Sequence, residues 1–286
     1  SKDSSLLHDN SGNSEYLALP ADFGAILNYE SSEWRDESFE IFSWTLFPDI
    51  LIMDTKDYQI QSRFFKRLAF FVEKHGYTGK IHDYKELEGI HGWNAHDYRA
   101  EDLARFFITA DKEEIALLPE EKILKNILLQ NGVLEYGDRG IRPGAGGILS
   151  ISRSSSSPQR HLLLSHEGYH GIFFSLDSFR NSCFTLWDNL ESWQKEIWKE
   201  FLRWFGYNIE DEYLVVNELQ AYLLQQPTEE ADRYFRSHPA MSTSLRSSST
   251  DKTPTFLSSS AFELNKVLYE LTGMRAGNLL NLIPID

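Results

Sequence analysis

The segment from His161 to Phe174 constrains the fold of this chain most strongly, because it combines an apolar pattern with a fixed set of polar side chains. Three leucines precede a His-Glu-Gly-Tyr-His sequence at 166–170, and an Ile-Phe-Phe sequence follows shortly after it. Apolar flanks of this kind predict a helix that is buried in a core. In a helix, residues four apart lie one turn apart on the same face, so the two histidines of the motif must project side by side.

The His-Glu-x-x-His pattern is a metal-site signature with a physical basis. Imidazoles at these two positions, His166 and His170, can bind one Zn²⁺ ion, and the intervening Glu167 points to a water at that ion and not to the ion itself. The pattern has two free positions and also occurs by chance, in which case the histidines only pack or form hydrogen bonds. A buried glutamate without a metal would lose its hydration uncompensated, which favours the metal site.

A catalytic zinc site needs a third protein ligand and an open position for water. The extended metzincin form of the motif would have glycine and histidine where this chain has Phe173 and Leu176, and Cys183 lacks the Glu-Gly-Cys context of a deformylase-type ligand. An apolar helical stretch at 216–222 reads Val-Asn-Glu-Leu-Gln-Ala-Tyr and contains Glu218.

With Glu218 in that position, residues 148–226 resemble the gluzincin zinc metallopeptidases, the group that includes thermolysin-like and lethal-factor-like enzymes. The resemblance implies a zincin-like domain in which His166, His170 and Glu218 bind Zn²⁺ and Glu167 is the general base.

One position departs from the thermolysin pattern. Thermolysin-like enzymes have an aspartate four residues after the ligand glutamate, where it orients a zinc-bound histidine, and this chain has Tyr222. We therefore expect another acceptor, either a backbone carbonyl or an acidic residue such as Asp177. If Glu218 is not the ligand, the remaining candidates are Glu212, Asp211 and His161.

The resemblance implies hydrolysis of a peptide or protein substrate. Glu167 would take a proton from water and pass it to the leaving nitrogen. A Tyr or His side chain would help to stabilise the oxyanion, and Tyr234 and His238 are the candidates. Two other classes stay open: a cell-surface binding or adhesion protein that retains zinc without turnover, and a zinc hydrolase of a non-peptide amide such as a cell-wall linkage.

A strand is expected just before the zinc helix. Residues 148–152 alternate apolar and polar after a glycine-rich turn, as a half-exposed strand does. In gluzincins an edge strand at this place lines the cleft and binds the substrate backbone by strand addition. The resemblance therefore implies substrate binding by Gly147, Ile148, Leu149 and Ser150.

Two histidines and an aspartate lie close together upstream, in the polar and aromatic segment 89–98. His91, His96 and Asp97 could form a second metal site, but their spacing matches no zinc pattern. A loop or a wall of the substrate cleft is the favoured interpretation, with Asp97 as the cap of the next helix.

Hydrophobic periodicity predicts an α+β protein with a flexible N-terminal segment at 1–20, an α+β region at 21–130, and a mainly helical region with a small sheet at 131–286. The resemblance to gluzincins implies that residues 131–286 form a zincin-like catalytic domain. Residues 175–190 are expected to be an irregular connection, and residues 237–260 a loop or mobile lid. Helices are expected at 30–47, 58–75, 100–108, 119–130, 192–205, 212–225 and 260–271. Strands are expected at 49–54, 133–136 and 148–152.

The composition argues against some classes of binding partner. A net charge of −15, from 28 basic and 43 acidic residues, argues against binding to nucleic acid or to anionic membranes. The single cysteine cannot form an intramolecular disulfide. We expect no transmembrane segment, because no apolar run approaches about 18–20 residues. The first 15 residues are rich in Ser, Asn and Asp, which slightly favours export to the periplasm, cell surface or medium over the cytoplasm; the oligomeric state stays open.

Overall fold

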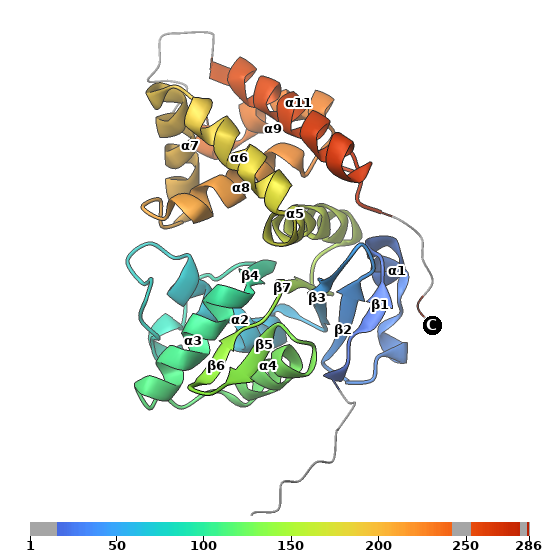
Figure 1. Ribbon diagram of the computed structural model, residues 1–286, viewed down its shortest axis with the longest axis vertical. Coiled ribbons are helices and arrows are strands. Elements are labelled where there is room, and N and C mark those ends of the chain that lie inside the picture. Colours follow the sequence, from blue (N-terminus) through green and yellow to red (C-terminus); the bar gives the residue numbers. More distant parts are fainter. Residues whose placement is uncertain (1–15, 242–252, 281–284, 286) are drawn as a thin grey trace, which may run out of the picture.

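The computed structural model describes residues 16–241, 253–280 and 285. A five-stranded mixed sheet occupies one half of the molecule, and helices fill the other half (Figure 1). The strands lie in the order β1 (Leu19–Ala21), β2 (Phe39–Trp44), β3 (Phe47–Thr55), β7 (Gly147–Ser152) and β4 (His96–Arg99). β1 pairs parallel with β2 and β3 pairs parallel with β7, whereas β2–β3 and β7–β4 are antiparallel. The expected α+β class is confirmed.

The central strands are buried on both faces. In β3, Ile50 and Ile52 belong to one core cluster, and Leu51 and Met53 belong to the other. This follows from the pleat, which directs successive side chains to opposite sides. The second cluster is covered by α2 (Tyr58–Val72), α3 (Ala100–Lys112) and α4 (Pro119–Gln130).

The first cluster packs against α5 (Ser157–Ser175), which lies between the sheet and the remaining helices (Figure 1). Those helices are α6 (Asp177–Asn189), α7 (Ser192–Phe205), α8 (Glu212–Leu224), α9 (Thr228–Ser237) and α11 (Thr253–Thr272). From Leu214 to Leu224 every residue of α8 is buried. An amphipathic surface helix would keep one polar face in water, so α8 is a central helix of this half.

Smaller elements complete the fold. Helix α1 (Phe23–Asn28) packs near α5, and β5 (Leu134–Gly137) pairs with β6 (Gly140–Pro143) in a separate hairpin. The single-turn helices are η2 (Ser31–Glu33) and η3 (Tyr84–Leu87). No helix in the described ranges is long and apolar enough to cross a bilayer.

Three expectations about secondary structure are wrong. Residues 30–47 are not an α-helix. They contain β2, whose aromatic and β-branched residues favour a strand and whose backbone pairs with β3. Residues 175–190 are not irregular, since Phe179, Cys183 and Leu186 bury one face of α6. The last helix begins at Thr253 and not at Ser260, so the end of the expected lid is helical; residues 242–252 lie outside the described part.

Other expectations are confirmed. The strand at 49–54 lies within β3, the helix at 119–130 is α4, and those at 192–205 and 212–225 are α7 and α8. The expected flexible segment 1–20 lies mostly outside the described residues, although its end belongs to β1. Strand β7 follows the boundary expected at residue 130 and yet pairs with β3 and β4, so one sheet joins the segments on both sides of that boundary.

Candidate metal centre

Helix α5 carries the His-Glu-x-x-His motif, and close packing sets its position. The helix starts where the Ser156 backbone N–H donates to Gln159 Oε1 at 3.0 Å. Within the motif, Gly168 leaves room for two neighbours: a Cβ there would lie 2.4 Å from Phe23 Cε2 and 2.7 Å from Leu279 Cδ1. A larger residue at 168 would therefore push α5 away from α1 and from the C-terminal segment.

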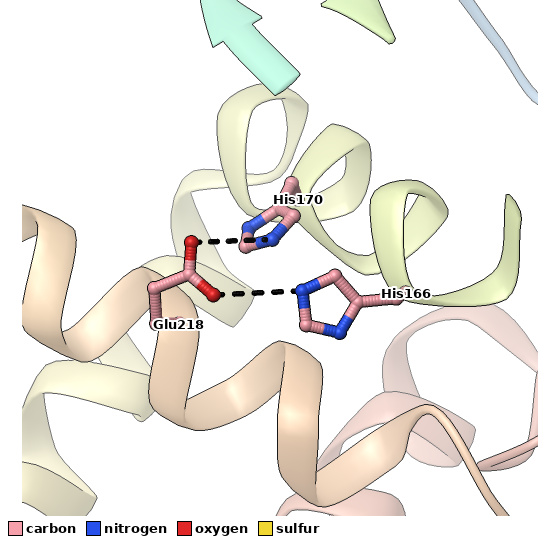
Figure 2. Close-up of side chains that lie close together, drawn as sticks. All are labelled: His166, His170 and Glu218. Carbon is pink, nitrogen blue, oxygen red and sulfur yellow. Dashed lines mark ion pairs between the residues drawn. The ribbon is translucent and has the colours of Figure 1, made fainter. Parts of the chain in front are cut away.

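The three predicted ligands meet between α5 and α8. His166 and His170 project from α5 toward Glu218 of α8 (Figure 2). His166 Nε2 lies 3.5 Å from Glu218 Oε2, and His170 Nε2 lies 3.8 Å from Glu218 Oε1. The three residues are 7%, 0% and 1% exposed, and one ligand atom from each lies within 4.8 Å of the others. Two nitrogens and one carboxylate oxygen are a donor set that Zn²⁺ accepts.

Each imidazole has a polar neighbour at Nδ1, the ring nitrogen that does not face Glu218. His166 Nδ1 lies 2.8 Å from Gln225 Oε1, and an amide oxygen only accepts, so Nδ1 donates to Gln225 and Nε2 is the ring nitrogen that faces Glu218. Gln225 follows Glu218 by two helical turns and therefore lies on the same face of α8. His170 Nδ1 lies 3.5 Å from Asp97 Oδ2, on the side away from Glu218.

Gln225 and Asp97 take the role that was expected of Asp177. The Asp177 side chain is 82% exposed and pairs with Arg180 at the start of α6, so that expectation is wrong. Tyr222, at the position where thermolysin-like enzymes have aspartate, packs its ring edge-on to His166, with the centroids 4.6 Å apart.

The alternative third ligands do not face the centre. Glu212 and His161 are exposed. Asp211 caps α8 by accepting a hydrogen bond from the Leu214 backbone N–H at 3.3 Å. Glu218 is thus the third-ligand candidate that converges with the two histidines.

Three further carboxylates surround the ligands. Glu167 precedes Gly168 on α5, Asp97 lies on β4, and Glu73 follows α2; all three are buried. Burial, followed by the negative charge of Glu218, raises the pKa of Glu73 and of Glu167 well above the usual range. Burial, followed by the charge of Glu167, does the same for the pKa of Asp97.

A backbone contact between the two halves of the molecule places Glu73. Lys74 and Tyr207 form an isolated β-bridge, and the Asn208 N–H donates to the Glu73 carbonyl oxygen at 2.7 Å. The Glu73 side chain accepts from Trp93 Nε1 at 2.7 Å. The sequence carries no local signal for this residue, because Glu73 reaches the site through pairing with a segment more than 130 residues away.

Asp97 lines the wall of a cleft, as the favoured interpretation of segment 89–98 predicts, but the expectation that it caps a helix is wrong. It is not a helix cap, since α3 starts after Arg99 and Asp97 lies within β4. His96 faces the opposite side of the strand, where its ring stacks on Phe65 at 5.0 Å and Nδ1 contacts the Tyr98 hydroxyl at 2.8 Å. Burial lowers the pKa of His96 to about 3. His96 and Asp97 therefore do not share a metal site, because neighbouring strand residues point to opposite faces.

The site contains buried polar atoms without partners. Within the described part of the chain, no hydrogen bond is made by Glu167 Oε2, by Glu218 Oε2 or by either ring nitrogen of His170. Burial lowers the pKa of His170 to about 4, so its ring is neutral at neutral pH. Unsatisfied buried groups are rare because each one costs about 1–3 kcal/mol. A metal ion bound between His170 Nε2 and Glu218 Oε2 would satisfy these two atoms, so the residues fit such an ion.

A cleft of about 650 Å³ opens onto these residues. It is lined by the expected catalytic candidates Tyr234 and His238, and also by Tyr207 and Tyr222. Burial and the charge of Glu218 raise the pKa of both Tyr207 and Tyr222, so their hydroxyls stay protonated and able to donate. The role of Tyr234 and His238 stays a prediction, with the two further tyrosines as additional candidates.

The strand expected to bind substrate is not an edge strand. β7 lies between β3 and β4, and Gly147, Ile148, Leu149 and Ser150 are all buried. The expectation is wrong because both backbone edges of β7 are occupied by neighbours. β4 is the edge strand instead, and Asn94, Ala95 and Asp97 on and beside it line the cleft.

The chemical interpretation of this centre rests on its own residues: two imidazoles, four carboxylates and a cleft that reaches them. Comparison with models of known protein families, with curated proteins and with solved structures gave no match to this chain.

Proposed function

We propose that the protein is a zinc-dependent peptidase of the gluzincin type, with a zincin-like catalytic domain. One observation carries the proposal: His166, His170 and Glu218 converge from two helices, with buried ligand atoms that lack hydrogen bonds in the described structure. Glu167 lies beside them, in the position that the motif assigns to a general base. If the histidines were merely structural, these buried atoms would be expected to have hydrogen-bond partners within the protein.

The residues around the centre divide the chemistry between them. A zinc ion bound there supplies Lewis-acid activation of water and of a carbonyl oxygen. Glu167 accepts the proton of the attacking water and returns it to the leaving nitrogen. Gln225 and Asp97 hold the imidazoles in place.

The edge strand suggests how a peptide would bind. β4 pairs with β7 along one side, and the described residues provide no strand partner on its other side. An extended peptide can add to such an edge through backbone hydrogen bonds. The scissile carbonyl would then lie in the cleft near Tyr207 and Tyr222, whose hydroxyls can donate to a developing oxyanion.

The test combines metal analysis with a broad peptide library read by mass spectrometry. The unsubstituted protein should bind zinc and cleave peptides. Glu167→Gln should retain zinc and lose about 10²–10⁴-fold in rate, the usual contribution of a general base. Glu218→Gln should lose zinc, whereas the matched control Glu212→Gln, an exposed glutamate on the same helix, should change neither property.

The outcomes separate the competing functions. Bound zinc without cleavage would favour a binding or adhesion protein that retains the metal, or a hydrolase of a non-peptide amide. Retained turnover in Glu167→Gln would remove the general base. A protein that takes up no zinc, even when zinc is offered, would leave the histidines structural and reject the proposal.

A further inference from the structure

A second group of ligand atoms lies beside the proposed zinc site. One carboxylate oxygen from each of Glu73, Asp97 and Glu218 lies within 4.8 Å of the other two, and all three residues are buried. We propose that these carboxylates bind a second divalent cation and that Glu218 bridges it to the zinc ion. This inference rests on the proposed function, because the two sites share Glu218.

The charge of the cluster supports a second cation. Glu73, Asp97, Glu167 and Glu218 bring four carboxylates into one buried region. Within the described ranges no Lys or Arg nitrogen forms an ion pair with any of them, and the nearby Lys74 places its Nζ 3.2 Å from the Trp93 ring centroid instead. When all four carboxylates are ionised, one Zn²⁺ offsets two of their negative charges and a second divalent cation offsets the other two, which removes the cost of burying uncompensated charge.

Unpartnered buried atoms adjoin this group, independently of its charge. Glu218 Oε2 and Glu167 Oε2 are buried and form no hydrogen bond in the described structure, and a Glu167 oxygen lies within 4.8 Å of an Asp97 oxygen. The donors that do reach the group are few. Trp93 Nε1 donates to Glu73 Oε2 at 2.7 Å, and Asn217 Nδ2 reaches Asp97 Oδ2 at 3.4 Å. Each donor engages one oxygen of its carboxylate, and a carboxylate has two.

The geometry and donor type indicate the class of cation. Two oxygens on opposite sides of a Mg²⁺ or Ca²⁺ ion lie about 4–5 Å apart, twice the metal–oxygen distance of roughly 2.0–2.6 Å. The three oxygens lie within 4.8 Å of one another, so one such ion can contact all three. Three carboxylate oxygens without an imidazole or thiolate are typical of hard cations such as Mg²⁺, Mn²⁺ or Ca²⁺. Two-metal sites commonly hold their ions about 3.5–4 Å apart, a separation that one bridging carboxylate can span.

The elements that supply these ligands explain why two ions can meet here. Glu218 comes from the helical half, whereas Asp97 and Glu73 come from β4 and the end of α2 in the sheet half. The two halves join at the Lys74–Tyr207 bridge beside the site. The zinc site is thus built mostly from α5 and α8, and the second site spans the contact between the halves.

The experiment titrates Mn²⁺ into zinc-loaded protein and follows free Mn²⁺ by electron paramagnetic resonance, with zinc content measured in parallel. The unsubstituted protein should bind about one Mn²⁺ per chain while it keeps its zinc. Glu73→Gln should keep zinc and weaken Mn²⁺ binding by at least about tenfold, as expected for loss of a metal ligand. Glu88→Gln, an exposed glutamate in the same half, is the matched control and should bind as the unsubstituted chain does.

Three results would overturn the inference: no Mn²⁺ uptake by the zinc-loaded unsubstituted protein, Mn²⁺ uptake with an equal loss of zinc, or unchanged uptake in Glu73→Gln. The first measurement needs no variant, so a substitution that fails to fold leaves the test intact. Failure to bind zinc at all would instead reject the proposed function. Zinc binding without a second ion would reject only this inference.

Discussion

Helix α5 contributes to two buried polar clusters, which differ in whether their polar atoms have partners within the protein. Near its start, Asp54 of β3 is fully buried and forms two hydrogen bonds of 2.8 Å with Arg160 and one of 3.0 Å with Arg153. Two turns further along, His166 and His170 meet Glu218 and three other carboxylates, with several buried atoms left unpaired in the described chain.

The difference separates a cluster whose polar groups are paired within the protein from the cluster that we propose binds metal. The single carboxylate of Asp54 has two guanidinium partners, so its charge and its lone pairs are satisfied within the protein. The cluster around Glu218 has four carboxylates and two imidazoles, and burial lowers the pKa of His170, so that ring does not offset their charge at neutral pH. Proteins keep unsatisfied buried groups mainly where an ion or substrate completes them.

Breaking the satisfied cluster should have the largest effect on stability. Arg160→Met removes the bidentate partner of Asp54 and should lower the free energy of unfolding by about 3–5 kcal/mol, because a buried carboxylate loses its main compensation. Urea unfolding measures this. Arg142→Met is the matched control: its ion pair with Glu135 is 63% and 46% exposed, and its loss should cost at most about 1 kcal/mol. Equal losses in the two variants would mean that burial does not distinguish the pairs.

Zinc binding to the cluster around Glu218 should have the next largest effect on stability. Zinc at about 100–1,000 times its Kd should raise the free energy of unfolding by about 2.7–4.1 kcal/mol through mass action. The same gain should appear in Arg160→Met, because Arg160 contacts Asp54 and takes no part in the metal cluster. Calorimetry with and without chelator measures the gain. A gain that persists in Glu218→Gln would place the zinc elsewhere.

The last effect is a slope with pH that is absent at neutral pH, and it concerns His96, which lies on the opposite face of β4 from the metal centre. Its pKa of about 3 in the folded protein lies below its ordinary value of 6.5. Its contribution to stability is therefore complete above about pH 6.5 and decreases as the pH falls toward 3, by up to about 1.4 kcal/mol per pH unit. The difference in unfolding free energy between the metal-free unsubstituted protein and His96→Gln should show this slope. A flat difference between pH 6.5 and 4.5 would mean that His96 is not held neutral by burial.

Sequence reasoning succeeded where the determinants are local. The spacing of His166 and His170 requires only one helix, and the apolar stretch around Glu218 identified α8. Pro119 and the Asn-Gly pair after Gln130 were enough to predict the bounds of α4. The prediction is wrong for β2. Its mixed acidic and aromatic residues suggest a helix, but pairing with β3 makes the segment a strand.

The placement of β7 also depends on strand pairing that its local sequence does not reveal. Its alternating pattern predicts a half-exposed strand and the resemblance to gluzincins implies an edge strand, but β7 is buried and pairs with β3 on one side and with β4 on the other. Ser150 is buried because Gln61 Nε2 donates to its hydroxyl at 3.1 Å. A polar residue in a strand therefore does not by itself indicate a solvent face when another element supplies a hydrogen bond.

The sequence by itself determined the pair of imidazoles, the neighbouring glutamate and the glutamate of a second helix, because helix periodicity sets side-chain direction over short spans. Only the tertiary structure decided that Gln225 and Asp97 orient those imidazoles, that β4 forms the edge beside the cleft, and that Glu73 joins the cluster. These residues come from elements far apart in the chain. Their meeting depends on strand order and on packing between the two halves, which no local pattern records.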